Sequence, residues 1–223
     1  MPLPARRRAW TIIACVIALV CAAPRAYADG LFGTREQFSA DLAAFTKWDG
    51  VVARTEHEMR NAGPPCQTCV AAEWHDFIAE LAALPLRERV VRANDVLNRV
   101  RYVSAVVNWR DPDHWETPYE FLARGGQCQD YAIAKFMALT ASGVPESALR
   151  LVVVHDRVTG LDHAVTVVYV DGEAMVLDNQ VHEVVPSSRL PRYVPYYSIN
   201  RTGWWYHLPR TPGERVQVAR ATN

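Results

Sequence analysis

Apolar residues recur every three to four positions through the first half of the chain, the spacing of one buried face of an α-helix. We therefore expect helical segments within residues 34–48, 73–84 and 87–107. Core packing is the simplest interpretation of all three stripes. Their apolar positions are Phe38, Leu42, Phe45 and Trp48, then Trp74, Phe77, Ile78 and Leu81, then Val90, Val91, Ala93, Val96, Leu97, Val100 and Val103.

The pattern changes in the second half of the chain. Residues 118–122 predict a short turn of helix, and Gly125-Gly126 breaks it before a longer helix over 128–139. Helices followed by antiparallel strands indicate an α+β fold. The strands are predicted by apolar runs, most of them rich in valine, at 149–154, 164–170, 173–177 and 204–208.

One turn signal sets the register of two of these strands. The dipeptide Asp171-Gly172 predicts a two-residue β-hairpin turn in which Val170 pairs with Glu173. Opposed residues share a face of the sheet, as do residues two apart on one strand. This register places His163 and Asp178 on one face as diagonal neighbours, about 7–8 Å apart at the backbone. A loop one residue longer would put them on opposite faces.

Cys128 follows the glycine break and begins the predicted helix. Free backbone N–H groups and the positive end of the helix dipole lower the pKa of a thiol at this position. The same N–H groups can donate to the oxyanion of an acyl-transfer reaction. With His163 as proton acceptor and Asp178 orienting the imidazole, the three residues predict a thiol nucleophile. A buried structural cysteine is the alternative.

Other polar residues near the hairpin offer rival assignments. Asp162 adjoins the histidine of the pair, but successive residues of a strand point to opposite faces. His155 and His182 are alternative bases that have no positioned carboxylate in this register. Asn179 replaces Asp178 as the orienting group if the register slips by one residue.

The N-terminus has the order of a secretory signal peptide. Three arginines at 6–8 precede an apolar run over 10–23, and Ala26-Tyr27-Ala28 supplies the small residues of a cleavage site. We expect cleavage after Ala28, which assigns 1–28 to the signal and leaves no membrane span in the mature chain. A retained anchor is the alternative, but crossing a bilayer takes about 20 residues and this run is shorter.

Composition favours a folded domain over a disordered chain, because 50% of the residues are hydrophobic. The formal net charge is +0, whereas a nucleic-acid-binding protein needs a basic face. We therefore expect no nucleic-acid partner. Loss of the arginines of the signal would make the mature chain net acidic.

After removal of the signal, Cys66, Cys69 and Cys128 remain, an odd number for an oxidising compartment. A local disulfide between Cys66 and Cys69 is the leading interpretation, and it leaves Cys128 as a free thiol. A zinc site with His57 or His75 is an alternative, although a second cysteine pair is missing. A redox-active C-x-x-C is another, although a βαβ pattern is missing.

Three segments taken together resemble the bacterial transglutaminase-like cysteine proteinases, over roughly residues 30–210. The resemblance implies a papain/transglutaminase-like fold. It also implies that Cys128 is the nucleophile, His163 the general base and acid, and Asp178 the residue that orients the histidine. The segments are Gly126-Gln127-Cys128-Gln129-Asp130-Tyr131-Ala132-Ile133-Ala134-Lys135, Asp162-His163-Ala164-Val165 and Leu177-Asp178-Asn179.

The resemblance further implies one protease domain over 29–223. Its parts are a helical region over 29–125, the catalytic helix and sheet over 126–210, and a tail over 211–223. The implied function is that of a periplasmic endopeptidase that cleaves a large surface adhesin near its N-terminus and so controls biofilm attachment. An inner-membrane receptor for a cyclic dinucleotide is the implied regulator. Two alternatives stay open: an enzyme that transfers the acyl group to an amine, and a non-catalytic periplasmic interaction module.

One departure from the family motif concerns calcium. Acidic residues on both sides of the cysteine help to hold calcium in the family, but Gln127 and Gln129 stand there in this chain. A hard cation prefers carboxylate oxygens, and Asp130 is the acidic residue that the motif keeps as a candidate ligand. We therefore expect no required cofactor and a calcium-independent enzyme.

Overall fold

The computed structural model describes residues 30–61 and 70–210. These residues form a helical first half and a mainly β second half. The α-helices are α1 (Thr46–Asn61), α2 (Val70–Ala83), α3 (Leu86–Leu97), α4 (Ala105–Trp109), α5 (Pro118–Arg124) and α6 (Cys128–Ala141). The strands are β1 (Arg35–Ser39), β2 (Leu149–Asp156), β3 (Leu161–Val170), β4 (Glu173–Leu177), β5 (Val185–Pro186), β6 (Tyr193–Asn200) and β7 (Gly203–Leu208). Short 3₁₀ turns are η1 (Leu31–Gly33), η2 (Glu146–Ala148) and η3 (Ser187–Arg189).

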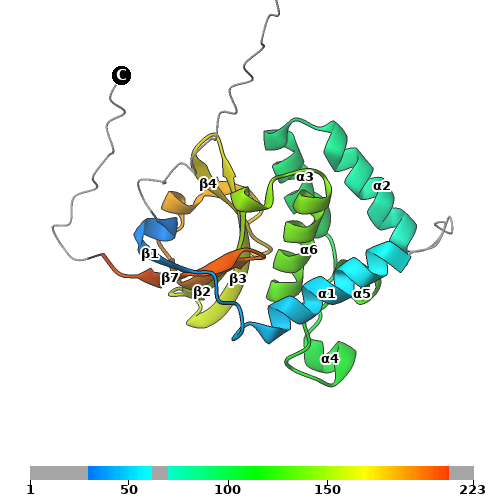
Figure 1. Ribbon diagram of the computed structural model, residues 1–223, viewed down its shortest axis with the longest axis horizontal. Helices are drawn as coiled ribbons and strands as arrows, with labels where there is room; N and C mark the ends of the chain where they lie inside the picture. The colour runs from blue at the N-terminus through cyan, green and yellow to red at the C-terminus, as the bar shows by residue number, and fades with distance from the viewer. Residues whose placement is uncertain (1–29, 62–69, 211–223) are drawn as a thin grey trace, which may run out of the picture.

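All the strands belong to one antiparallel sheet in the order β1-β7-β6-β2-β3-β4-β5. Helix α6 lies against β3 and β2, and α2, α3 and α5 pack around α6 (Figure 1). Helix α4 projects from the same end of the molecule as the N-terminus of α6 (Figure 1). The predicted α+β class, with a helix packed on an antiparallel sheet, is confirmed.

The hairpin turn at Asp171-Gly172 forms as predicted, and Val170 pairs with Glu173. Both turn residues have positive φ, 52° and 87°, as a type I′ turn requires. The ladder continues without a bulge to Thr166. The predicted register of β3 and β4, on which the histidine–aspartate pair depends, is therefore confirmed.

The expected helix early in residues 34–48 is wrong. Strand β1 occupies the start of this segment and pairs along its whole length with β7, and helix α1 begins only at Thr46. Phe38 is 53% exposed, and its ring centre lies 5.0 Å from that of Trp205 on β7. Pairing with a strand near the other end of the chain therefore outweighs the local apolar spacing.

The single long helix expected over 87–107 is also wrong. Helix α3 ends well before residue 107, and α4 follows after an extended link. In this link Tyr102 forms a parallel bridge with Gly126, and the N–H of Val103 donates to the Gly126 carbonyl over 2.9 Å. The backbone of the link is therefore used to hold the loop that leads into α6, which an uninterrupted helix could not do.

Two apolar cores cover the two faces of the sheet. Side chains of β3 alternate between them: Ala164 and Val168 belong to the larger core with α6, while Val165 and Val167 belong to the smaller one. This alternation is what a strand buried on both faces requires. The smaller core is closed by residues of η1 and by Tyr193 of β6.

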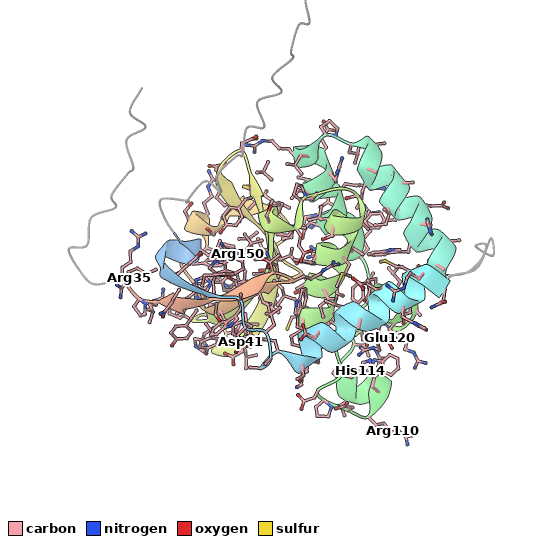
Figure 2. All side chains as sticks on the ribbon, viewed as in Figure 1. Arg35, Asp41, Arg110, His114, Glu120 and Arg150 are labelled. Carbon is pink, nitrogen blue, oxygen red and sulfur yellow. The ribbon has the colours of Figure 1, made fainter. Side chains whose placement is uncertain are left out.

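Side-chain contacts fix the start of α5, which precedes the loop into α6. Thr117 and Glu120 form a reciprocal capping box, a motif that satisfies two helix N–H groups at once. Figure 2 shows His114 and Glu120 beside each other beneath α1, and Arg110 at the outer end of α4, pointing away from the body. His114 Nε2 lies 3.2 Å from Glu120 Oε2. The carboxylate of Glu120 is therefore held by both the cap and a histidine.

Several sequence predictions lie outside the described residues: the signal at 1–28, the Cys66–Cys69 pair and the tail at 211–223. Within 30–61 and 70–210, no helix combines the length and apolar character needed to cross a membrane. The region 29–125 is not purely helical, because it contributes β1 to the sheet.

Gly125 provides a test of how the loop into α6 is held. It has φ 77° and ψ 168°, a combination essentially restricted to glycine, and a Cβ there would stand 2.3 Å from the Arg101 carbonyl oxygen. We predict that Gly125→Ala lowers the free energy of unfolding by about 3 kcal/mol or more, measured by urea denaturation. Gly160→Ala is the matched control, since Gly160 has φ 71° but nothing within 4 Å of a Cβ. This control should lower the free energy of unfolding by about 1–2 kcal/mol. Equal losses in the two variants would contradict a clash between a Cβ at position 125 and the Arg101 carbonyl.

Candidate active site

Cys128 is the first residue of α6 and is a partly exposed, free cysteine. Helix α6 is anchored beside β3, because Thr166 Oγ1 donates to the Ala132 carbonyl over 2.6 Å. This contact brings the N-terminus of α6 next to the start of β3. The thiol therefore lies at the end of the strand that carries His163.

Hydrogen bonds between Gln127 and Asp130 fix the N-terminus of α6. The Asp130 N–H donates to the Gln127 backbone carbonyl, and the Asp130 carboxylate accepts from the Gln127 N–H, each over 2.9 Å. Gln127 Oε1 also accepts from the N–H of Ala105, the first residue of α4, over 3.3 Å. The first N–H groups of a helix have no acceptor inside it, so those beside the Cys128 thiol can donate to a ligand.

His163 and Asp178 form a buried pair, as the hairpin predicts. Nε2 of His163 lies 2.7 Å from Asp178 Oδ1, and the two residues are 3% and 1% exposed. A carboxylate only accepts, so Nε2 donates. The Cys128 thiol donates to Gln129 Oε1 over 3.6 Å, and it lies near enough to the imidazole to raise the pKa of His163. The imidazole is therefore bonded to the carboxylate through Nε2, and Nδ1 is the ring nitrogen left for the thiol.

Asp178 accepts further hydrogen bonds besides the one from His163. The Tyr193 hydroxyl donates to Oδ2, and the Gln180 backbone N–H donates to Oδ1 over 2.8 Å. Burial alone would raise the pKa of Asp178, but the hydrogen bonds from His163 and Tyr193 hold that pKa below its ordinary value. Burial alone would lower the pKa of His163, but Asp178 and Cys128 raise it to about 9. The carboxylate therefore stays ionised, and the histidine readily takes a proton.

Two asparagines of α3 hold the loop that follows β4. Asn98 Nδ2 donates to the Asp178 carbonyl over 2.7 Å, and Asn94 Nδ2 donates to the His182 carbonyl over 3.0 Å. The apolar stripe of this segment predicts packing alone. Asn94 falls on that stripe in the sequence, and in the structure it is 0% exposed, where a buried amide needs a partner.

Lys135 is a second group that sequence analysis did not single out. It lies two turns after Cys128 on α6, is 1% exposed, and its Nζ has no hydrogen-bond partner among the described residues. Nζ lies 6.0 Å from the centre of the Tyr131 ring. Burial lowers the pKa of Lys135 to about 7, although the charge of Asp178 acts in the opposite direction. When protonated, this lysine helps to keep Asp178 ionised.

The rival residues lie apart from the thiol. His155 does have a carboxylate partner, contrary to the sequence prediction: it faces Asp162 across β2 and β3, with Nδ1 3.2 Å from Oδ1. The Tyr196 hydroxyl also donates to Asp162, whose side chain is 67% exposed. His182 contributes its backbone carbonyl to the contact with α3. None of the hydrogen bonds within the described residues joins these groups to Cys128.

Calcium does not fit the residues around Cys128. Both oxygens of Asp130 already accept backbone N–H groups, from Glu116 and Gln127, each over 2.9 Å. Burial raises the pKa of Asp130 to about 7, so a proton competes for the carboxylate near neutral pH. In the described part of the chain, no three His, Cys, Asp or Glu side chains are grouped to hold a metal ion. Asp130 is a capping residue here.

A second buried carboxyl group faces Asp130. Glu116 is 0% exposed, and its Oε1 accepts from Trp109 Nε1 over 2.6 Å and from Asn108 Nδ2 over 3.0 Å. Glu116 Oε2 and Asp130 Oδ2 lie 2.8 and 2.9 Å from the point where a Cβ on Gly126 would stand. Two adjacent buried carboxyl groups hold a proton more readily than two charges. A side chain at 126 would clash with both carboxyl groups, so this position requires glycine.

The fold and the site define a thiol hydrolase of the papain/transglutaminase type, in which a helix-start cysteine faces a histidine–aspartate pair on antiparallel strands. The model of the family described as bacterial transglutaminase-like cysteine proteinase matches residues 66–212. The chain belongs to this family and is a cysteine protease.

Solved structures of LapG from Legionella pneumophila are similar to this chain. The calcium-bound form is 26% identical with a TM-score of 0.57, covering 70% of this chain and 87% of LapG. The EGTA-treated form is 25% identical with a TM-score of 0.57, covering 73% and 87%. A search of curated protein sequences found no match. The likeness supports the fold and the protease activity, and membership of a protease family argues against a non-catalytic module.

The histidine–aspartate pair predicts a pH-dependent stability. The pKa of His163 is raised from 6.5 to about 9, so its stabilising effect is complete below pH 6.5 and is lost as the pH rises through 9. The effect is on the order of 3 kcal/mol. We predict that the free energy of unfolding lost in His163→Gln is largest near pH 6 and shrinks toward pH 9, measured by urea denaturation. Lys135 also changes its charge between pH 6 and 9, but the parental protein and the His163→Gln variant both contain it, so it is common to the two measurements. A loss independent of pH would contradict the pairing.

Proposed function

We propose that this protease is a periplasmic endopeptidase that cleaves a large surface adhesin near its N-terminus. In this proposal Cys128 is the nucleophile, His163 the general base and acid, and Asp178 the residue that orients the histidine. The observation that carries the catalytic assignment is the buried hydrogen bond of 2.7 Å between His163 and Asp178, with the helix-start thiol of Cys128 near enough to raise the pKa of the same histidine.

The geometry suits hydrolysis through an acyl-enzyme. Nδ1 of His163 accepts the thiol proton as Sγ of Cys128 attacks the peptide carbonyl carbon, and the first N–H groups of α6 hold the oxyanion. The imidazolium then gives its proton to the leaving amine as the C–N bond breaks. A water molecule, deprotonated by the same nitrogen, attacks the thioester and releases the carboxylic acid and the thiol. Asp178 keeps Nε2 protonated throughout.

Large apolar side chains are exposed on the link after α3 and on α4, close in sequence to the loop that leads into α6. Burial raises the pKa of Tyr102, and the neighbouring Cys128 and Asp130 act in the same direction. Tyr102, Val106 and Val107 are 60%, 54% and 74% exposed on the link and α4. Exposed apolar side chains at one place favour a binding role over a structural one.

The proposed location and regulation rest on the sequence. The signal-like pattern at 1–28 supports export, and the family resemblance implies an inner-membrane cyclic-dinucleotide receptor that holds the enzyme in check.

Replacing the nucleophile tests the function directly. We predict that Cys128→Ala abolishes cleavage of adhesin N-terminal fragments, a loss of about 10³-fold or more because no other group can form the thioester. Cleavage by the purified mature chain is followed on gels, and circular dichroism checks that the variant folds. His155→Ala is the matched control, a half-buried histidine with its own carboxylate partner, and should retain parental activity.

Each outcome has a separate meaning. Cleavage by Cys128→Ala at the parental rate would refute the mechanism. Activity of the parental enzyme on other peptides but on no adhesin fragment would refute the substrate. Incorporation of a labelled amine in place of hydrolysis would assign the protein to amide transfer.

We further infer that the enzyme acts without calcium. The carboxylate of Asp130 is used by backbone N–H groups, and Gln127 ties α4 to α6 through its side chain. Hydrogen bonds therefore fix the start of the nucleophile helix, which lessens the need for a cation there.

Chelation provides the measurement. We predict that EGTA leaves the cleavage rate within about twofold and the melting temperature unchanged, because a ligand that does not bind the native state cannot stabilise it. The double variant Gln127→Asp, Gln129→Glu is the comparison: it places carboxylates on both sides of Cys128 and should make the melting temperature rise with added calcium. Loss of parental activity in EGTA, restored by calcium, would overturn the inference.

A further inference from the structure

The side chain of Gln180 lies against the active-site histidine. Its Nε2 is 3.4 Å from Nδ1 of His163, the nitrogen available to Cys128. Gln180 is exposed, whereas His163 is 3% exposed. The amide is therefore on the solvent side of a buried ring, at the atom through which the thiol proton must pass.

Arg192 determines which end of this amide faces the histidine. Nη2 of Arg192 lies 3.1 Å from Gln180 Oε1. A guanidinium group only donates, so the amide oxygen must face Arg192 and the amide nitrogen must face His163. Asp156 holds Arg192 in turn, with Nε 3.0 Å from Oδ1 and Nη2 bonded to Oδ2. The orientation of Gln180 is therefore set by a chain of side chains that starts at the end of β2.

An amide N–H can donate only to an unprotonated ring nitrogen. Gln180 therefore favours the neutral imidazole, whereas Asp178 and Cys128 favour the imidazolium. A general base is most effective when its pKa is close to the working pH, and Gln180 acts in that direction. The titratable and charged groups around His163 are Asp178, the Cys128 thiol and the Tyr193 ring at 5.8 Å, with Arg192 behind Gln180 and Lys135 beyond Asp178.

We propose that Gln180 is a positioning residue of this protease: its amide, oriented by Arg192, holds Nδ1 of His163 as a hydrogen-bond acceptor for the proton of Cys128. The proposal rests on the proposed role of His163 as the base. No bond forms or breaks at Gln180, which yields Nδ1 to the proton when the thiol is deprotonated and donates to it again when the proton has left.

The test follows the histidine itself, by NMR titration of the His163 imidazole in the purified mature enzyme. Gln180→Glu keeps a partner for Arg192 but replaces the donor with an acceptor, and should raise the pH at which His163 loses its proton by about one unit. Gln180→Ala removes the donor and should raise this pH by about half a unit. Gln37→Glu changes an exposed glutamine of β1 and should cause no shift. The pH dependence of kcat/KM has a limb set by the protonation of His163, and the midpoint of that limb should shift by the same amount as the NMR titration. Replacing a residue with a purely structural role would not shift this midpoint.

Arg192→Lys extends the test to the orienting group. It keeps the positive charge but loses the planar guanidinium group that bonds Asp156 and Gln180 at the same time. The pH at which His163 loses its proton should therefore rise by part of the shift expected for Gln180→Ala. An unchanged titration of His163 in both Gln180 variants, or a shift toward lower pH, would overturn the proposal. The titration needs no substrate, so shifts found in an enzyme that cleaves no peptide would support this inference while refuting the proposed function.

Discussion

The hydrogen bond between His163 Nε2 and Asp178 Oδ1 constrains the rest of the molecule, because it joins two residues that meet only if β3 and β4 keep one register. A carboxylate that is 1% exposed is costly unless its oxygens are satisfied. The fold supplies donors from separate elements: the ring on β3, the Tyr193 hydroxyl on β6 and a backbone N–H in the loop after β4. Asn98 of α3 holds the carbonyl of the same residue. The sheet and the helical layer therefore both depend on Asp178.

The nucleophile is positioned by a different set of contacts. The link after α3 pairs with Gly126, the Gln127–Asp130 cap closes the first turn of α6, and Glu116 packs against Asp130 through the space that Gly126 leaves. These contacts are local hydrogen bonds and one pair of buried carboxyl groups. They fix the start of the nucleophile helix through groups of the chain itself.

The sequence was most informative where a local rule applies. The two-residue turn at 171–172 set a register that brought His163 and Asp178 together, and the glycine break marked the start of α6. It was least informative where the partner lies far along the chain: β1 pairs with β7, β6 pairs with both β2 and β7, and the link at 98–104 pairs with Gly126. Asn98 and Arg192 look like surface residues in the sequence, since only the fold shows what they contact. Local periodicity therefore predicts elements, whereas tertiary pairing decides which residues support the site.

The burial of the site is uneven, and this has a consequence for catalysis. His163 and Asp178 are almost fully buried, whereas Cys128 is partly exposed and Gln180 is exposed. A substrate that covers the thiol therefore changes the surroundings of the sulfur much more than those of the carboxylate. The orientation of the imidazole and its bond to Asp178 are in place before a peptide binds, so they cost no reorganisation during the reaction. What the substrate can alter is the environment of Nδ1, which faces the Gln180 amide and is the ring nitrogen that Asp178 leaves free.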